Sequence, residues 1–174
     1  RSDVADTVAR IEADMGPIDM LVNVAGLRAV SPLAEMDPDV WEEVFAVNAR
    51  GTFLCLQAVI RAMIPRRHGA IVTIGSQGST VVRQDRAAYG ASKSAGDYTT
   101  KCLGLEVARY GIRCNVVHPG VTATPQSTAN WKAGKGSAAT HIDGDLAEFR
   151  VPIPLGKVAQ PADTANMVLF LLSD

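Results

Sequence analysis

The sequence predicts a three-layer α/β domain, in which helices cover both faces of a parallel sheet. Three short runs rich in Val, Ile and Leu, at 18–24, 70–75 and 112–117, support this fold class. The runs are continuous rather than alternating, which is typical of strands that are buried on both faces. Longer helical patterns separate them, and this alternation favours right-handed connections in a doubly wound sheet. We therefore expect one domain over residues 1–174.

Asp or Pro marks several helix starts, and helices are expected at 3–15, 38–65, 87–110 and 161–172. Gly16, Gly69 and Gly111 follow three of them, as expected where helices stop. In an open sheet of this kind, ligands bind beyond the carboxyl ends of the strands. The residues that end the three apolar runs are therefore the first candidates for a site.

The segment 125–154 has no clear period, unlike the rest of the chain. Its glycines and small polar residues predict a mobile lid over the site. A plain surface loop is the alternative.

Composition and charge exclude several classes of protein. With 47 % hydrophobic and 20 % charged residues, the chain has enough apolar mass for one packed core. A formal net charge of -1 leaves no basic surface for nucleic acid. We find no uninterrupted apolar segment near the roughly 18 residues of a membrane span, and no signal-peptide pattern. We therefore expect a cytoplasmic protein that binds neither nucleic acid nor membrane.

The cysteines and histidines form no recognisable framework. Cys55, Cys102 and Cys114 are odd in number and lie in apolar stretches, which favours buried thiols in a reducing compartment over disulfides. The histidines are isolated and lack metal-ligand spacing; they are His68, His118 and His141. The sequence therefore predicts no metal site.

The most informative motif lies in the expected helix 87–110 and reads Tyr89-Gly90-Ala91-Ser92-Lys93. In a helix, Tyr89 and Lys93 stand one turn apart on the same face. An ammonium beside a phenol favours the phenolate, which makes tyrosine a usable base near neutral pH. The structural alternative is a half-buried tyrosine with a solvated lysine, because short motifs often occur by chance.

Four further features accompany this motif. The sequence Asn-Val-Ala-Gly at 23–26 ends the first apolar run, Asn48 interrupts an apolar helix, Ser76 ends the second run, and Pro-Gly at 119–120 follows the third. Together with the Tyr-Lys motif, they resemble the short-chain dehydrogenase/reductase family over essentially the whole chain. The resemblance implies a Rossmann-like fold and a catalytic tetrad of Asn48, Ser76, Tyr89 and Lys93.

The family resemblance also implies a role for each member of the tetrad. Tyr89 takes the hydroxyl proton of an alcohol while hydride leaves the same carbon for a nicotinamide, and Ser76 hydrogen-bonds the reacting oxygen. Lys93 keeps the phenol acidic and contacts the nicotinamide ribose. Asn48 is expected to interrupt local helix hydrogen bonding and hold a water leading to Lys93. The alternative for Asn48 is a capping or kink residue.

The resemblance assigns a nicotinamide cofactor, NAD with NADP not excluded, to a set of residues along the strand ends. Asp3 and Val4, expected at the end of a strand, would contact the adenine. The other expected cofactor contacts are Asn23, Ala25, Gly26, Tyr89, Lys93, Pro119, Gly120, Thr122 and Thr124. Val24 departs from the Asn-Asn-Ala-Gly that is usual in the family.

Measured against the family, the sequence lacks the first strands, with their glycine-rich pyrophosphate turn, and the last strand. We therefore expect a longer native protein, because a three-stranded sheet would leave its edges unpaired. The acidic or basic residue that separates NAD from NADP belongs to the missing part.

A narrower resemblance lies in 113–124 and 151–161, which look like the corresponding parts of 2,3-dihydro-2,3-dihydroxybenzoate dehydrogenases of siderophore biosynthesis. Arg83 stands where that subfamily carries an arginine, whereas His118 replaces its common serine. The implied substrate is a ring carboxylate, for which a guanidinium is a bidentate partner. The expected substrate contacts are Ser76, Arg83 and Tyr89, with Arg86 as an alternative fork; a solvated loop arginine is the other reading for both.

Two other functions share these residues. One is a 3-oxoacyl-thioester reductase, or another short-chain reductase, that uses NADPH. The other is a catalytically silent module that binds partners through helices 38–65 and 87–110. The family forms tetramers through these helices, so we also expect a homotetramer or a dimer.

Overall fold

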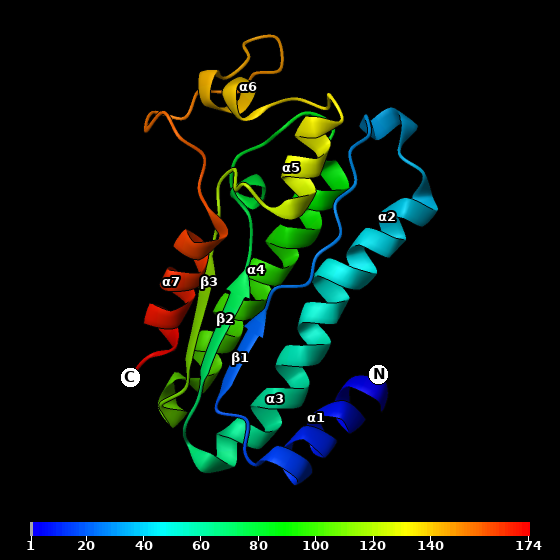
Figure 1. Cartoon of the computed structure of the whole chain (residues 1–174). Coiled ribbons are helices and arrows are strands. Elements are labelled where there is room, and N and C mark those ends of the chain that lie inside the picture. Colours follow the sequence, from blue (N-terminus) through cyan, green and yellow to red (C-terminus); the bar gives the residue numbers. More distant parts are fainter. Residues whose placement is uncertain (1) are drawn as a thin grey trace.

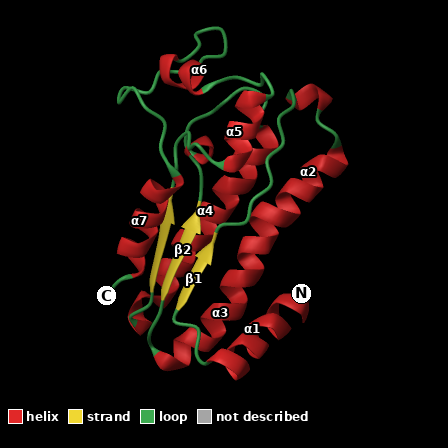
Figure 2. Cartoon of the chain, in the orientation of Figure 1, coloured by secondary structure: helices red, strands yellow, loops and turns green. Residues whose placement is uncertain are grey.

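The computed structural model describes residues 2–174 and confirms the three-layer α/β fold (Figures 1 and 2). The sheet contains three strands in the order β1-β2-β3, all parallel. Their bounds are Met20–Asn23, Ala70–Ile74 and Arg113–Val117. Register pairs Asn23 with Thr73, and Thr73 with Val116, so the three strands end at the same edge.

Helices cover both faces of the sheet. α3 (Thr52–Arg66) and α4 (Ala87–Val107) contact one face, and α7 (Pro161–Leu172) contacts the other. α1 (Ser2–Met15) lies outside this sandwich, packed against α3. The alternating sides of a strand explain the two halves of the core, because Ile71 joins the apolar cluster under α3 and its neighbour Val72 joins the cluster under α7.

The long helix expected at 38–65 is divided into three parts. α2 (Pro38–Phe45) begins at the Asp37 cap, whose side chain accepts a hydrogen bond from the backbone of Asp39. A π-helical turn, η2 (Ala46–Gly51), connects it to α3. α3 ends at Arg67, which adopts a left-handed conformation with φ 54°.

The beginning of the chain and the segment 125–154 differ from their expected structures. Residues from Ser2 onward are helical, so Asp3 and Val4 lie in the first turn of α1 and not at the end of a strand. The segment 125–154 contains α5 (Pro125–Lys132) and α6 (Ala138–Asp143). Both helices begin with local caps, at Thr124 and Ser137. Such hydrogen bonds form between residues close in sequence and need no long apolar period.

One helical stretch among the described residues, Pro38–Arg66, is long and apolar enough to cross a membrane by length and composition alone. This finding differs from the expectation that no apolar segment approaches the length of a membrane span. One third of its most apolar window is buried inside the domain, where α3 packs against β1 and α4. A core helix of a folded domain passes the same test, so this stretch is weak evidence for a membrane span.

Candidate active site

The candidate site lies beyond the carboxyl ends of the three strands (Figure 1). Residues 23–26 continue from β1, Ser76 follows β2, and Pro119 follows β3. Backbone hydrogen bonds hold the last two segments together, because Gly75 N donates to Val117 O at 2.9 Å and Gln77 N donates to Pro119 O at 3.1 Å. The sheet thus brings together residues that are nearly one hundred positions apart.

Asn48 connects three parts of the site. Its amide donates to Leu27 O at 2.8 Å and to Ser92 Oγ at 2.9 Å, and its Oδ1 accepts from Leu27 N at 2.7 Å. Its own carbonyl accepts from Thr52 Oγ1 at 2.8 Å. The interruption of helix hydrogen bonding expected at Asn48 is confirmed by the π-helical turn. The side chain itself is a buried link between η2, α4 and the chain after β1, and its hold on a water stays a prediction.

Lys93 is buried, so the reading of a solvated lysine is wrong. Its ammonium donates to Ile74 O at 2.8 Å. Burial lowers the pKa of Lys93, because desolvation disfavours the charged form, while the nearby Asp97 acts in the opposite direction. Gly26 passes directly over the ammonium, since a Cβ at this position would lie 3.0 Å from Nζ and 3.4 Å from Asn48 Oδ1. A larger residue at 26 would push against both side chains.

Ser76 and Tyr89 face the same short turn, η3 (Gln77–Ser79). Ser76 caps this turn, and its Oγ accepts from Gly78 N at 3.0 Å. A Cβ on Gly78 would lie 3.4 Å from Ser76 Oγ and 3.6 Å from Tyr89 Cε1, so the hydroxyl and the ring flank one small residue. The half-buried Tyr89 makes no side-chain hydrogen bond within the described residues. Its phenol is therefore available to a ligand.

The other expected cofactor residues are divided between exposed and structural positions. Ala25, Gly26 and Gly120 are exposed at the strand ends, where small residues let a ligand approach the backbone. Asn23 Nδ2, in contrast, donates to Thr73 Oγ1 at 3.2 Å and ties β1 to β2.

The second half of the loop 119–124 is held by the backbone of Ala159. Ala123 N donates to Ala159 O at 2.8 Å, and Ala159 N donates to Val121 O at 2.9 Å. Thr122 and Thr124 lie in this loop, and Thr124 caps α5. The position of Asp3 and Val4 in α1 leaves their contact with an adenine a prediction.

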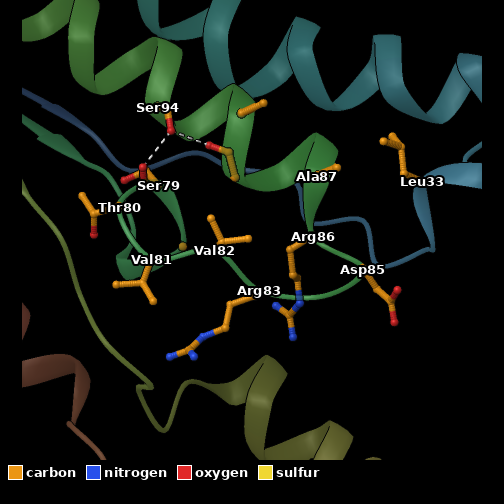
Figure 3. A pocket seen from close by; sticks show the side chains of 13 residues that line it. Leu33, Ser79, Thr80, Val81, Val82, Arg83, Asp85, Arg86, Ala87 and Ser94 are labelled. Atoms are coloured by element: carbon orange, nitrogen blue, oxygen red, sulfur yellow. Dashed lines mark hydrogen bonds between the residues drawn. The ribbon is translucent and has the colours of Figure 1, made fainter. Parts of the chain in front are cut away.

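Arg83 and Arg86 line an open pocket of about 320 Å³ beside the tetrad (Figure 3). The pocket includes Gly78 from the turn that Tyr89 faces, but Tyr89 itself does not line it. Burial, followed by repulsion from Arg28, lowers the pKa of Arg86 to about 10, while Tyr89 acts in the opposite direction. Arg86 is therefore a half-buried cation close to Tyr89, and the reading of a solvated loop residue is wrong for it.

Two further arginines, which the sequence analysis missed, act on Arg86. They are Arg28, two residues after Gly26, and Arg150, near the end of the segment 125–154. We call Arg28, Arg83, Arg86 and Arg150 the arginine cluster. Arg150 contacts His141 Nδ1 of α6 at 2.9 Å and also pairs with Glu148. The pKa of His141 is lowered by burial and then by Arg150, Arg86 and Arg28. The segment 125–154 thus contributes directly to the edge of the site.

The cysteines and histidines differ from their expected environments in detail. The three cysteines are free, as expected, but half-buried rather than buried. Burial raises the pKa of Cys114 to about 11 and also raises the pKa of Cys55. His118 and His141 are not isolated, since His118 pairs with Asp97 and His141 with Arg150. Residues 2–174 contain no group of three or more His, Cys, Asp or Glu that could hold a metal.

Ser92 and Asp97 are two further buried polar residues that sequence reasoning missed. Ser92 accepts from Asn48 and donates to Tyr89 O at 2.9 Å, so it connects two members of the expected tetrad. Asp97 lies one helical turn after Lys93 and is 5 % exposed. The carboxylate four residues after a key lysine was a visible signal, because such pairs share a helix face.

Comparisons with known proteins agree with this geometry. A family model described as Enoyl-(Acyl carrier protein) reductase matches residues 1–174. The chain is 46 % identical to the 2,3-dihydro-2,3-dihydroxybenzoate dehydrogenase of Bacillus subtilis (strain 168), over 98 % of this chain and 65 % of that protein. It is 44 % identical to the vibriobactin-specific 2,3-dihydro-2,3-dihydroxybenzoate dehydrogenase of Vibrio cholerae serotype O1, with the same coverage. The chain therefore spans 65 % of the length of these two relatives.

A solved structure shares the fold. It is a gluconate 5-dehydrogenase from Burkholderia cenocepacia J2315 in complex with NADP and tartrate. The TM-score is 0.86 at 34 % identity, and the match covers 99 % of this chain and 64 % of that one.

Proposed function

The chain belongs to the short-chain dehydrogenase/reductase family, and on that premise we propose that it oxidises a secondary alcohol with a nicotinamide cofactor. The observation that carries the proposal is the convergence of Tyr89 and Ser76 on Gly78, next to the buried ammonium of Lys93. The turn after β2 supplies Ser76, and α4 supplies Tyr89 and Lys93. Asn48 of η2 links α4 to the chain after β1. Polar groups gathered in this way are typical of a catalytic constellation and not of a surface for partner binding.

Small, exposed residues at the strand ends fit a nicotinamide cofactor. Gly26 leaves room above Lys93 that any side chain would fill, and Gly120 has no atom within 4 Å of the position of a Cβ. A bound cofactor supplies the hydride acceptor. We propose NAD, which the resemblance implies. NADP, with which the gluconate 5-dehydrogenase was solved, is the alternative.

The residues of the chain perform the proton transfer in this proposal. Tyr89, as phenolate, accepts the hydroxyl proton while the same carbon loses hydride. Ser76 donates a hydrogen bond to the reacting oxygen and fixes its distance from Tyr89. Lys93 stabilises the phenolate through its positive charge. Asn48 holds Leu27 and Ser92, and so keeps Gly26 over Lys93.

We propose 2,3-dihydro-2,3-dihydroxybenzoate as the substrate, oxidised to 2,3-dihydroxybenzoate for siderophore biosynthesis. Two relatives bear this activity in their names. The arginine cluster supports the proposal, because several guanidiniums of like charge repel one another until an anion binds between them. Arg86 is the best candidate for the carboxylate, since it interacts with both Tyr89 and the other arginines. Arg83 lines the same pocket.

The segment 125–154 acts as a substrate lid in this proposal. Its α6 stands beyond the carboxyl edge of the sheet (Figure 1), and its Arg150 joins the arginine cluster. We propose that the protein is a cytoplasmic homotetramer or dimer. Apolar side chains exposed on α3 and α4, such as Phe53, Tyr98 and Leu105, support the association.

The test is to follow NADH formation by full-length protein with 2,3-dihydro-2,3-dihydroxybenzoate and NAD. A parallel assay supplies an acetoacetyl thioester with NADPH. Activity in the first assay alone is the expected result. Activity only in the second would replace the substrate and keep the mechanism, whereas inactivity in both, with intact folding and cofactor binding, would favour a silent partner-binding module.

A further inference from the structure

A buried carboxylate lies beneath the candidate active site and has no place in the tetrad. Asp97 follows Lys93 by one turn of α4, and both residues are among the buried charged side chains of the domain. Lys93 Nζ donates to Ile74 O at 2.8 Å. A Cβ on Gly75 would lie 2.4 Å from Asp97 Oδ1. The two charged groups therefore lie beside adjacent residues, Ile74 and Gly75, at the end of β2 and just before Ser76.

The two oxygens of Asp97 have different environments. Oδ2 accepts from Ser79 Oγ at 2.5 Å and lies 2.8 Å from His118 Nε2. Oδ1 is buried and has no hydrogen-bond partner. Ser79 and His118 hold the carboxylate by one edge, and the other oxygen is left over the backbone of Gly75. A buried polar atom without a hydrogen bond costs free energy, so the arrangement needs a compensating interaction.

The buried ammonium of Lys93 has no charged hydrogen-bond partner within the described residues. Its ammonium is buried, and its one side-chain hydrogen bond goes to a backbone carbonyl, which carries a dipole but no net charge. Burial alone lowers the pKa of Lys93, and the charge that acts against this effect is Asp97. Asp97, whose direct ion-pair partner is His118, thus supplies an opposite charge that acts on Lys93 from beyond ion-pair distance.

The elements packed against α4 offer no equivalent charge. β2 and η3 carry no ionisable side chain, and β3 carries Arg113 and Cys114. Arg113 is exposed and donates to carbonyls at the end of α7. The other ionisable residues on elements that contact α4 are Arg50 of η2, Asp39, Glu42 and Glu43 of α2, Cys55, Arg61 and Arg66 of α3, and Arg109 and Tyr110 of η4. None of these is buried, whereas Asp97 is 5 % exposed. His118 faces Asp97 itself.

We propose that Asp97 is a positioning residue, a buried counter-charge that keeps the Lys93 side chain in its ammonium form at the carboxyl end of β2. Ser79 and His118 orient this carboxylate. The catalytic consequence rests on the proposed function, because an ammonium at Lys93 is what favours the phenolate of Tyr89. The electrostatic pairing itself concerns residues of this chain alone and can be measured without cofactor or substrate.

The test follows the protonation of Lys93 directly in the full-length protein. The described chain contains few lysines, so 13C-labelled lysine gives a simple spectrum, and loss of one signal in Lys93→Met assigns it. Replacing Asp97 by Asn removes the charge at nearly constant size. We expect the Lys93 signal to titrate about one pH unit lower in Asp97→Asn than in the parent, since the loss of a near opposite charge shifts a pKa by that order.

Three further variants keep the result interpretable. Asp97→Ala also removes the charge and, unlike Asp97→Asn, introduces no buried amide. It should therefore give the same shift in the Lys93 titration, and it replaces Asp97→Asn if the amide disturbs the fold. Thr100→Val removes a buried hydrogen bond one turn further along α4 without a change of charge, and should leave the titration in place. Ser79→Ala removes one partner of Asp97 and keeps the carboxylate, so it should change the titration far less than Asp97→Asn.

An unchanged titration of Lys93 in folded Asp97→Asn or Asp97→Ala would overturn the proposal. So would failure of both variants to fold, because Asp97 would then be structural. In the active enzyme, Asp97→Asn should shift the alkaline limb of the kcat–pH profile to lower pH by a similar amount. Thr100→Val should change the maximum value of kcat and leave the position of this limb unchanged. Absence of dehydrogenase activity in the parent would refute the proposed function and leave the Lys93 measurement valid.

Discussion

The floor of the candidate site and the arginine cluster at its edge are built in opposite ways. The floor consists of the buried polar residues Asn48, Ser92, Lys93, Asp97 and Thr100. They are held by hydrogen bonds between elements, such as Asn48 to Ser92 and Thr100 to Thr73, both at 2.9 Å. The arginine cluster gathers charges of one sign, of which Arg150 is paired with Glu148. Burial, followed by repulsion from the other arginines, acts on Arg86.

This contrast corresponds to two physical tasks. Groups that transfer a proton gain from fixed positions, because errors of an ångström cost rate. Groups that recognise an anion gain from charge that no neighbour neutralises, because the ligand then brings the missing partner. We therefore expect changes in the floor to affect rate and stability, and changes in the arginine cluster to affect affinity.

The largest expected effect concerns Tyr89, which lies beside the floor and is not one of its buried residues. Tyr89→Phe removes the phenol and keeps the ring, so kcat should fall by about a thousandfold, the usual scale for loss of a general base. The thermal unfolding midpoint should stay close to that of the parent, because the hydroxyl makes no hydrogen bond within the described residues. Steady-state rates and a melting curve on the same sample check both parts. Turnover equal to the parent would remove Tyr89 from the mechanism.

The second prediction tests whether the floor carries stability. Asn48→Ala removes two donated bonds and one accepted bond at a buried position. The free energy of unfolding should fall by about 3 kcal/mol, since each buried group left unsatisfied costs roughly 1–3 kcal/mol. Urea denaturation of the cofactor-free protein measures it. Gln126→Ala, on the exposed face of α5, is the control and should change little. Equal losses in the two variants would contradict the contrast.

The third prediction concerns affinity at the arginine cluster. Arg86→Gln should raise KM for a carboxylate substrate by about tenfold to a hundredfold and leave kcat nearly unchanged, because a charged hydrogen bond contributes roughly 1.5–3 kcal/mol. Arg10→Gln, at an exposed position of α1, is the matched control. A fall in kcat at constant KM would instead show that Arg86 acts in the catalytic step and not in substrate binding.

The smallest expected effect is a pH dependence of stability at His141, in the proposed lid. Burial and the arginines hold the pKa of His141 below its ordinary value, so the unfolded state binds this proton more readily than the folded state. Stability should therefore fall as the pH drops through the ordinary histidine range, about 6.5, and the loss is complete below the folded pKa.

The variant His141→Asn removes this contribution, so its thermal midpoint should fall less steeply with acid than that of the parent. His68→Asn, at the exposed end of α3, is the control and should follow the parent curve. Parallel curves for His141→Asn and the parent would show that the lid histidine has no part in the acid response.

The layers of the fold and the positions of most of the expected tetrad could be predicted from the sequence alone. Continuous apolar runs predicted the three parallel strands. The expected burial on both faces is found for β2, whereas β1 and β3 are half-buried and begin with exposed residues. Tyr89 and Lys93 could be paired from the periodicity of one helix, and Ser76 could be located because it directly ends β2. These inferences depend on residues that are close in sequence or on the direction of a strand.

Only the tertiary structure decided what lies between these residues. The link from Asn48 to Leu27 and Ser92, the pairing of Asp97 with His118, and the approach of Arg150 to Arg86 all join segments more than twenty positions apart. Local helix and strand preferences hold no information about such contacts. They form because packing removes water from polar groups, which must then find partners wherever the fold has brought them.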